Sequence, residues 1–229
     1  MKIHTLHRWD VDPSDARAIQ GNLAVQVVKR DTFTSVSTVC GVDVSFKGGM
    51  ASAACVVMNF PELEMLVYST HSTPVRFPYI SGLLSFREIP PLLHALETLT
   101  VEPDLIIADG QGIAHTRALG LASHLGLLLD TPTIGCAKSR LTGSFEEPGE
   151  ERFDWEYLHR GDDIIGAVLR TRRGAKPVFV SIGHRISLHS ALYYVSRCCT
   201  KYRITEPVRT AHRLAGDTHF FVRNPNLGV

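Results

Sequence analysis

Runs of apolar residues alternate along the chain with short polar turns, and several of these runs have the length and turn signals of β-strands. Three early runs are separated by glycine and proline turns, so they predict three antiparallel strands in succession. They span residues 37–46, 51–59 and 63–70. Two short apolar runs and a later pair predict four more strands, the last two as a hairpin. These strands are expected at residues 105–108, 133–137, 164–169 and 177–182.

Other segments repeat their apolar residues at helical spacing. Asp12 is expected to cap the first helix with Pro13 in its first turn, and Pro90-Pro91 are expected to open the second. A stripe of leucine and alanine predicts a third helix directly after the glycines near residue 110. The expected helices cover residues 12–30, 90–99, 115–129, 187–199 and the segment that begins at Glu206-Pro207.

The order of these elements predicts an α/β fold. A β-β-β-α-β-α-β succession describes a mixed central sheet, with three antiparallel strands followed by parallel strands and with helices on both faces. The chain shows no internal repeat, low-complexity tract or linker. We therefore expect one catalytic domain over residues 1–229.

Composition narrows the class of protein. The 24 basic and 23 acidic residues give a net charge of +1, unlike the strongly basic charge of a non-specific nucleic-acid binder. Basic residues nevertheless gather at 170–176 and 197–213, while the acidic stretch 146–156 is expected to be a solvated loop. No run reaches the roughly 18 apolar residues of a membrane span, and the N-terminus carries early charge. The five cysteines lack CxxC spacing, so we expect free thiols in a cytoplasmic monomer with no membrane contact.

Three carboxylates carry the candidate chemistry. Asp109 ends an apolar run and is followed by Gly110 and Gly112, in the position where ligands gather at the carboxyl ends of strands. Asp43 interrupts an apolar strand, which is costly unless the charge is paired or holds a metal. If the two strands are neighbours, roughly 4.8 Å apart, both side chains can share one divalent ion. Glu88 is expected just before the proline-initiated helix.

The donor types favour Mg²⁺, with Mn²⁺ as a substitute, since oxygen ligands stand without clustered cysteine or histidine. Such a site suits phosphodiester hydrolysis. Lys138, at the end of the strand 133–137, would neutralise charge on a phosphate. The alternatives are that Asp43 is exposed on an edge strand, that Glu88 only caps a helix and that Lys138 is a solvated lysine.

Long stretches of the chain resemble the endonuclease V family, whose members have a ribonuclease H-like fold and nick DNA near deaminated bases. The resemblance extends in order over nearly the whole chain. It rests on the segments Gly41-Val-Asp-Val-Ser-Phe46, Phe77-Pro-Tyr-Ile-Ser-Gly-Leu-Leu-Ser-Phe-Arg-Glu88, Asp109-Gly-Gln-Gly-Ile-Ala-His115 with its continuation to Lys138, and Glu206-Pro-Val-Arg-Thr-Ala-His-Arg-Leu214.

The resemblance implies a role for each matching residue. Asp43 and Asp109 match magnesium ligands, and Glu88 matches a third catalytic acid that acts through water or a second ion. The remaining matches are Lys138 and His212 near the scissile phosphate, Tyr79 as a wedge that enters the duplex, His115 after the glycine loop, and Gly82, Gly110 and Gly112 as walls of the pocket for the everted base. Family members cut the second phosphodiester bond 3′ to deoxyinosine and leave 3′-hydroxyl and 5′-phosphate ends.

Two positions depart from the family pattern. Many members have proline where this chain has Ser81 and Thr116, and the loss of a fixed φ at Ser81 bears on the stiffness of the wedge loop. The expected partner is DNA that contains deoxyinosine or another deaminated base. Inosine-containing RNA and a binding module without catalysis are the alternatives. Arginines of the C-terminal cluster, Arg209 among them, are expected to follow the DNA backbone.

Overall fold

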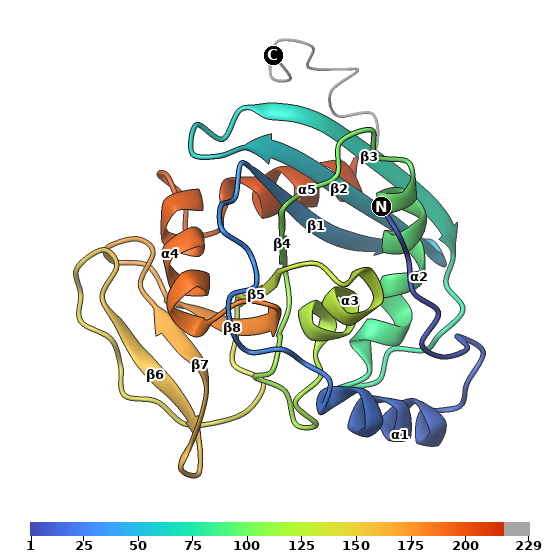
Figure 1. Ribbon diagram of the computed structural model, residues 1–229, viewed down its shortest axis with the longest axis horizontal. Coiled ribbons are helices and arrows are strands. Elements are labelled where there is room, and N and C mark those ends of the chain that lie inside the picture. Colours follow the sequence, from blue (N-terminus) through green and yellow to red (C-terminus); the bar gives the residue numbers. More distant parts are fainter. Residues whose placement is uncertain (218–229) are drawn as a thin grey trace.

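One mixed sheet of eight strands runs through residues 1–217, the part of the chain that the computed structural model describes (Figure 1). Across the sheet the strands lie in the order β3-β2-β1-β4-β5-β8-β7-β6. Their bounds are β1 Thr38–Lys47, β2 Met50–Asn59, β3 Met65–Pro74, β4 Leu105–Ala108, β5 Thr133–Ala137, β6 Trp155–Arg160, β7 Asp163–Leu169 and β8 Val178–His184.

Strand direction follows the predicted pattern. Strands β1, β2 and β3 form an antiparallel meander, whereas β1, β4 and β5 are parallel neighbours. The predicted hairpin of β7 and β8 is confirmed and is antiparallel, and β8 also pairs antiparallel with β5. The parallel strands place their carboxyl ends at one edge, where Val42 pairs with Ala108 and Ala108 with Gly135.

Helices cover both faces of the sheet, as predicted (Figure 1). Buried side chains of α2 and α3 pack on one face with alternate residues of β1, β2 and β4, and those of α4 and α5 pack on the other face. Helix α1 lies beside α3. The helices are α1 Pro13–Ala24, α2 Leu84–Glu97, α3 Leu121–Leu129, α4 Leu188–Cys198 and α5 Glu206–Gly216.

Two predicted helix starts are wrong, and both errors concern the site. Helix α2 begins at Leu84, so Pro90 and Pro91 lie inside it and Glu88 is a helical residue. Complete burial of residues such as Ile89 outweighs the backbone hydrogen bonds that the prolines remove. Helix α3 begins at Leu121 because residues 109–120 bond among themselves. In this loop the Gly120 N–H donates to the Gly112 carbonyl, 2.9 Å away.

Other boundaries also differ from the prediction. Helix α1 ends at Ala24, six residues early, because the Val28 N–H donates to His184 Nδ1 at 3.2 Å, a contact outside any helix. Strand β3 continues to Pro74. Strand β6 was not predicted, and its first two residues belong to the acidic segment that was expected to be a loop.

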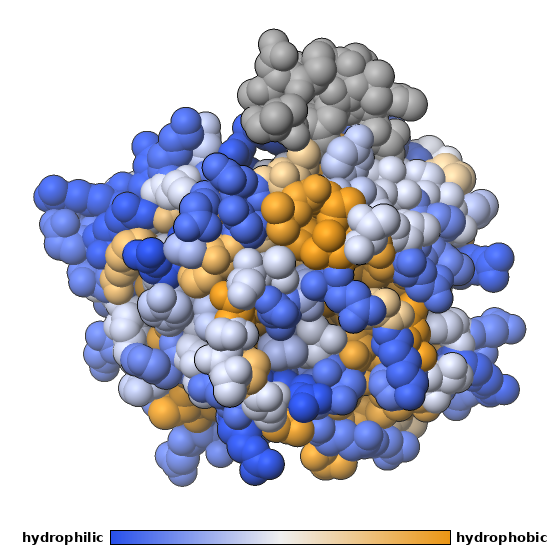
Figure 2. Space-filling view, turned by 45° about the horizontal axis from the view of Figure 1, so that its top comes forward, coloured by the Kyte–Doolittle hydropathy of each residue, from blue (hydrophilic) through white to orange (hydrophobic). Residues whose placement is uncertain are grey.

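Figure 2 shows one face of the molecule, on which hydrophilic side chains predominate around hydrophobic ones. All five cysteines are buried free thiols. Within residues 1–217 no helix has both the length and the apolar character that a bilayer crossing requires.

Candidate active site

Three polar side chains meet where the parallel strands end. Asp43 lies in β1 and Asp109 follows β4 directly, and Lys138 follows β5 directly. The strand pairing brings these ends side by side, and the ammonium of Lys138 bonds to the carboxylate of Asp109. The sequence prediction that Asp43 and Asp109 come together is thereby realised.

A fourth side chain arrives from the far end of the sequence. His212 lies on α5, and its Nδ1 is 2.8 Å from Oδ2 of Asp43. The helix approaches the sheet this closely because residue 41 is glycine. A Cβ at Gly41 would lie only 2.0 Å from the backbone carbon of Pro207, at the start of α5. The residues Val208 and Ala211 then seal the helix against the sheet, since both are fully buried.

Asp43, Asp109 and His212 form a compact group. Each offers one ligand atom, and these atoms all lie within 4.8 Å of one another. Glu88 was predicted as the third acid of this group, but the structure places it outside these three. Glu88 lies on α2, which packs on the face of the sheet opposite to α5, and it lines the same pocket as Asp43 and Asp109. Only 9% of Glu88 is exposed.

Burial and mutual repulsion disfavour charge on two of these carboxylates. Burial, followed by the charge of Asp109, raises the pKa of Asp43, while His212 and Lys138 oppose the shift. The pKa of Glu88 is raised well above its usual range, first by burial and then by Asp43 and Asp109. A cation bound among these three crowded carboxyl groups would stabilise their ionised form.

The donor set fits a divalent metal ion. Two carboxylates and one imidazole lie within reach of one point, and the carboxylate oxygens, with the buried Glu88 nearby, are the donors that a hard divalent cation prefers. Asp43, Asp109 and His212 would hold the ion. Lys138 already supplies one positive charge to Asp109.

A cavity of about 400 Å³ opens beside the carboxylates. It contains several of the residues predicted to bind the lesion, and Tyr79 at its rim is 75% exposed. Its lining includes Gln20, Asp43, Tyr79, Gly82, Glu88, Asp109, Gly110, His115 and Lys138. The carboxylates and the residues predicted to bind the lesion therefore line the same concave surface.

Gly112 stands apart from this cavity. It is not among the lining residues, and a Cβ there would lie 2.0 Å from the carbonyl oxygen of Ile182 in β8. Its N–H donates to Ser181 Oγ at 2.8 Å. Glycine at 112 thus lets the loop after β4 pack directly on β8, whereas Gly110 lines the cavity itself.

His115 is buried and neutral. Its pKa falls to about 4, because burial and the charge of Arg117 disfavour protonation. The Arg117 N–H donates to its Nδ1 at 3.2 Å, so Nε2 carries the proton and donates to the Gly82 carbonyl at 3.0 Å. Gln20 and Arg117, which were not predicted as site residues, also contact Gly82. One signal was available for Gln20, a polar residue one helical turn after Ala16 on the apolar face of α1.

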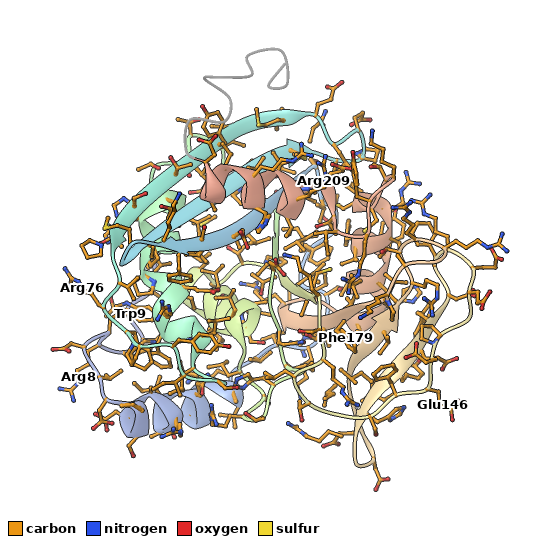
Figure 3. The ribbon with its side chains drawn as sticks, turned by 180° about the vertical axis from the view of Figure 1, so that it is seen from behind. Arg8, Trp9, Arg76, Glu146, Phe179 and Arg209 are labelled. Carbon is orange, nitrogen blue, oxygen red and sulfur yellow. The ribbon has the colours of Figure 1, made fainter. Side chains whose placement is uncertain are left out.

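Two arginines of the C-terminal cluster, which were expected to follow a DNA backbone, make contacts within the protein. Arg209, seen on α5 in Figure 3, is ion-paired with Glu206 and stacks 4.1 Å above the ring of Tyr202. Arg203 donates to the carbonyls of Lys138 and Pro177, at 2.6 and 2.8 Å. The contacts with Glu206 and Tyr202 argue against a phosphate contact for Arg209, and the salt dependence of DNA binding tests that expectation.

A second groove, of about 730 Å³, begins at the same strand ends. It shares Lys138, Ser139 and Arg140 with the first cavity and continues past Arg173 and Lys176. Figure 3 labels one residue of its lining, Phe179 on β8. The groove adds positive charge next to the carboxylates.

Comparisons with known proteins agree with this geometry. The family model for Endonuclease V matches residues 21–213. An Endonuclease V of Trichormus variabilis is 51% identical over 221 residues, which cover 95% of this chain and 100% of the relative.

Solved structures give the same result. The Endonuclease V of Streptomyces avermitilis is 40% identical with a TM-score of 0.87, covering 97% of this chain and 98% of that one. A Ciona intestinalis Endonuclease V, solved with a 23mer DNA containing an inosine followed by a ribo-adenosine, is 29% identical with a TM-score of 0.78, covering 91% and 97%. The expected ribonuclease H-like fold is confirmed. The chain belongs to the Endonuclease V family of nucleases.

Proposed function

We propose that this nuclease recognises deoxyinosine in DNA and hydrolyses the second phosphodiester bond 3′ to it, with Mg²⁺ as the cofactor. The observation that carries the proposal is the position of Asp43 and Asp109, which form a compact group with His212, on the wall of a cavity whose rim carries the exposed Tyr79. The products are a 3′-hydroxyl and a 5′-phosphate, and the glycosidic bond stays intact.

Recognition requires the base to leave the helical stack. Extrusion costs a few kcal/mol, and it costs least for a mismatched base such as hypoxanthine. The exposed ring of Tyr79 offsets part of that cost by stacking in the vacated space, worth roughly 1–3 kcal/mol. The cavity beside it, at about 400 Å³, lies within the range of pockets that enclose small ligands. Gly82 and Gly110 leave its walls free of side chains there.

Side chains at the strand ends then surround the scissile phosphate. A bound magnesium ion supplies Lewis-acid activation of water and stabilises the leaving oxyanion. Asp43 and Asp109 hold their carboxylates at the strand ends, and His212 fixes Asp43 through its Nδ1. Lys138 brings positive charge to the side of Asp109 and is available to a phosphate oxygen. Burial raises the pKa of Glu88 well above its usual range, so this carboxyl group is placed to hold or release a proton.

A ribonucleotide after the inosine is the second candidate feature of the substrate. The Ciona relative was solved with DNA in which an inosine is followed by a ribo-adenosine. Matched duplexes that carry either a deoxyribonucleotide or a ribonucleotide after the inosine distinguish these two substrates, because a site that reads the 2′-hydroxyl prefers the ribose.

Replacing Asp43 tests the proposal. Asp43→Ala removes one carboxylate of the compact group, and we expect nicking to fall at least about a thousandfold while binding to the inosine duplex is kept. The matched control is Asp162→Ala, which removes an exposed carboxylate from the turn between β6 and β7. Equal nicking by Asp43→Ala and the parent would show that the assigned group does not perform the reaction.

A further inference from the structure

We propose that Gln20, in the N-terminal helix α1, is a positioning residue for lesion recognition, which acts by fixing the loop that carries Tyr79. The inference rests on the proposed function and deepens it. Gln20, His115 and Arg117 together hold the Gly82 carbonyl, and we name this set of contacts the Gly82 clamp.

Three side chains donate to one carbonyl oxygen in the clamp. Gln20 Nε2 donates at 3.0 Å, His115 Nε2 at 3.0 Å and Arg117 Nη2 at 2.7 Å. They come from two separate parts of the chain, since Gln20 belongs to α1 and the other two to the loop before α3. A carbonyl held from two sides restrains the position of its whole peptide unit.

Gln20 joins the parts of the clamp to one another. The side chain is 1% exposed, and its amide makes three hydrogen bonds. Besides Gly82, Nε2 donates to the Leu119 carbonyl at 3.0 Å, and Oε1 accepts from Arg117 Nε at 2.6 Å. The two carbonyl partners fix which end of the amide is nitrogen, because a reversed amide would place oxygen against both of them.

The clamped peptide belongs to a tight turn beside the wedge. The Leu83 N–H donates to the Ile80 carbonyl at 2.9 Å, and Gly82 has a φ of +76°. A glycine with positive φ at the third position is the mark of a type II turn, in which proline is favoured at the second position. That second position is Ser81 in this chain. Here the restraint that a proline ring would give comes from the clamp.

Glycine suits the clamped position because its φ is positive, and a Cβ there would lie 2.9 Å from Arg117 Nη2, so the guanidinium of the clamp would have to shift. The loop therefore has no freedom at Gly82, while three residues earlier Tyr79 is exposed. A wedge requires an exposed ring on a loop that is already fixed, because ordering the loop at the moment of binding would cost affinity.

Gln20→Met tests the role of the clamp, because it keeps the length of the side chain and removes all three hydrogen bonds. We expect its Kd for a duplex with one deoxyinosine to rise at least about tenfold, with the Kd for undamaged duplex unchanged. Gln26→Met, at an exposed glutamine after α1, is the matched control and should bind like the parent. If Gln20→Met does not fold, Gln20→Asn carries the same test with a shortened amide.

Two double variants distinguish a positioning role of Gln20 from a general loss of stability. In a Tyr79→Ala background, Gln20→Met should change lesion affinity less than twofold, because the wedge through which it acts is gone. Adding Ser81→Pro to Gln20→Met should restore part of the lost affinity, since proline stiffens the same turn. An equal loss in both backgrounds, an equal loss on undamaged DNA, or no rescue by Ser81→Pro would overturn the proposal.

The proposed function and the clamp fail in different ways. A parent protein that binds inosine and undamaged duplexes equally contradicts the proposed function. A parent that prefers the inosine duplex, together with a Gln20→Met variant that behaves like it, contradicts the clamp alone.

Discussion

A single methyl group at Gly41 should uncouple His212 from Asp43. In Gly41→Ala the new Cβ would lie 2.0 Å from the Pro207 carbon and 2.3 Å from the Pro207 carbonyl oxygen and the Val208 nitrogen. All three are backbone atoms, so no side-chain rotation relieves the contact. Ordinary van der Waals separation of 3.4 Å requires α5 to retreat by about 1.4 Å. His212 Nδ1, now 2.8 Å from Asp43, would then lie beyond hydrogen-bond reach.

The expected result is a large loss of rate in a variant that stays folded. Misplacement of a catalytic group by about 1 Å costs roughly a hundredfold in rate, whereas overpacking costs about 1–3 kcal/mol of unfolding free energy. Nicking of an inosine duplex at saturating enzyme measures the first, and urea denaturation the second. The matched control is Gly21→Ala, because a Cβ at Gly21 meets nothing within 4 Å. A Gly41→Ala variant that nicks at the parental rate would refute this reasoning.

The structure makes three further predictions. Tyr79→Ala should weaken binding to inosine duplex about tenfold or more while leaving metal binding unchanged by calorimetry, and parental affinity would contradict the wedge role. Burial and His7 lower the pKa of His124 to about 3, so its contribution to stability is complete above pH 6.5 and is lost as the pH falls toward 3. Between pH 7.5 and 5 this costs about 2 kcal/mol, and His124→Asn should remove that part of the pH dependence of unfolding. Arg209→Ala should leave the salt dependence of DNA binding unchanged, because the guanidinium is held by Glu206 and Tyr202, and a slope reduced by about one would show phosphate contact after all.

Strand-level features could be predicted because they are local. Apolar runs bounded by glycine and proline give the β1–β2–β3 meander and the short strands β4 and β5. Strand order then follows from the usual placement of parallel strands, which brings Asp43 beside Asp109. The oxygen-rich character of the candidate metal site follows from the residue types.

The remaining features depend on contacts between distant parts of the chain. Proline signals a helix start, yet α2 starts six residues before Pro90, because burial of its first turns outweighs the lost bonds. His212 meets Asp43 only because Gly41 admits α5, a packing detail that spacing does not contain. The clamp on Gly82 joins residues up to 99 positions apart, counting the bond from Gln20 to Leu119.

Mapping the break in a duplex that carries one deoxyinosine, labelled at either end of the damaged strand, tests directly whether this chain cuts beside the lesion. With the purified chain and Mg²⁺ we predict a single nick at the second phosphodiester bond 3′ to the lesion. The new ends should be a 3′-hydroxyl and a 5′-phosphate, and a chelator should abolish the nick. A released hypoxanthine base, a nick elsewhere, or cleavage that persists without divalent metal would contradict the account.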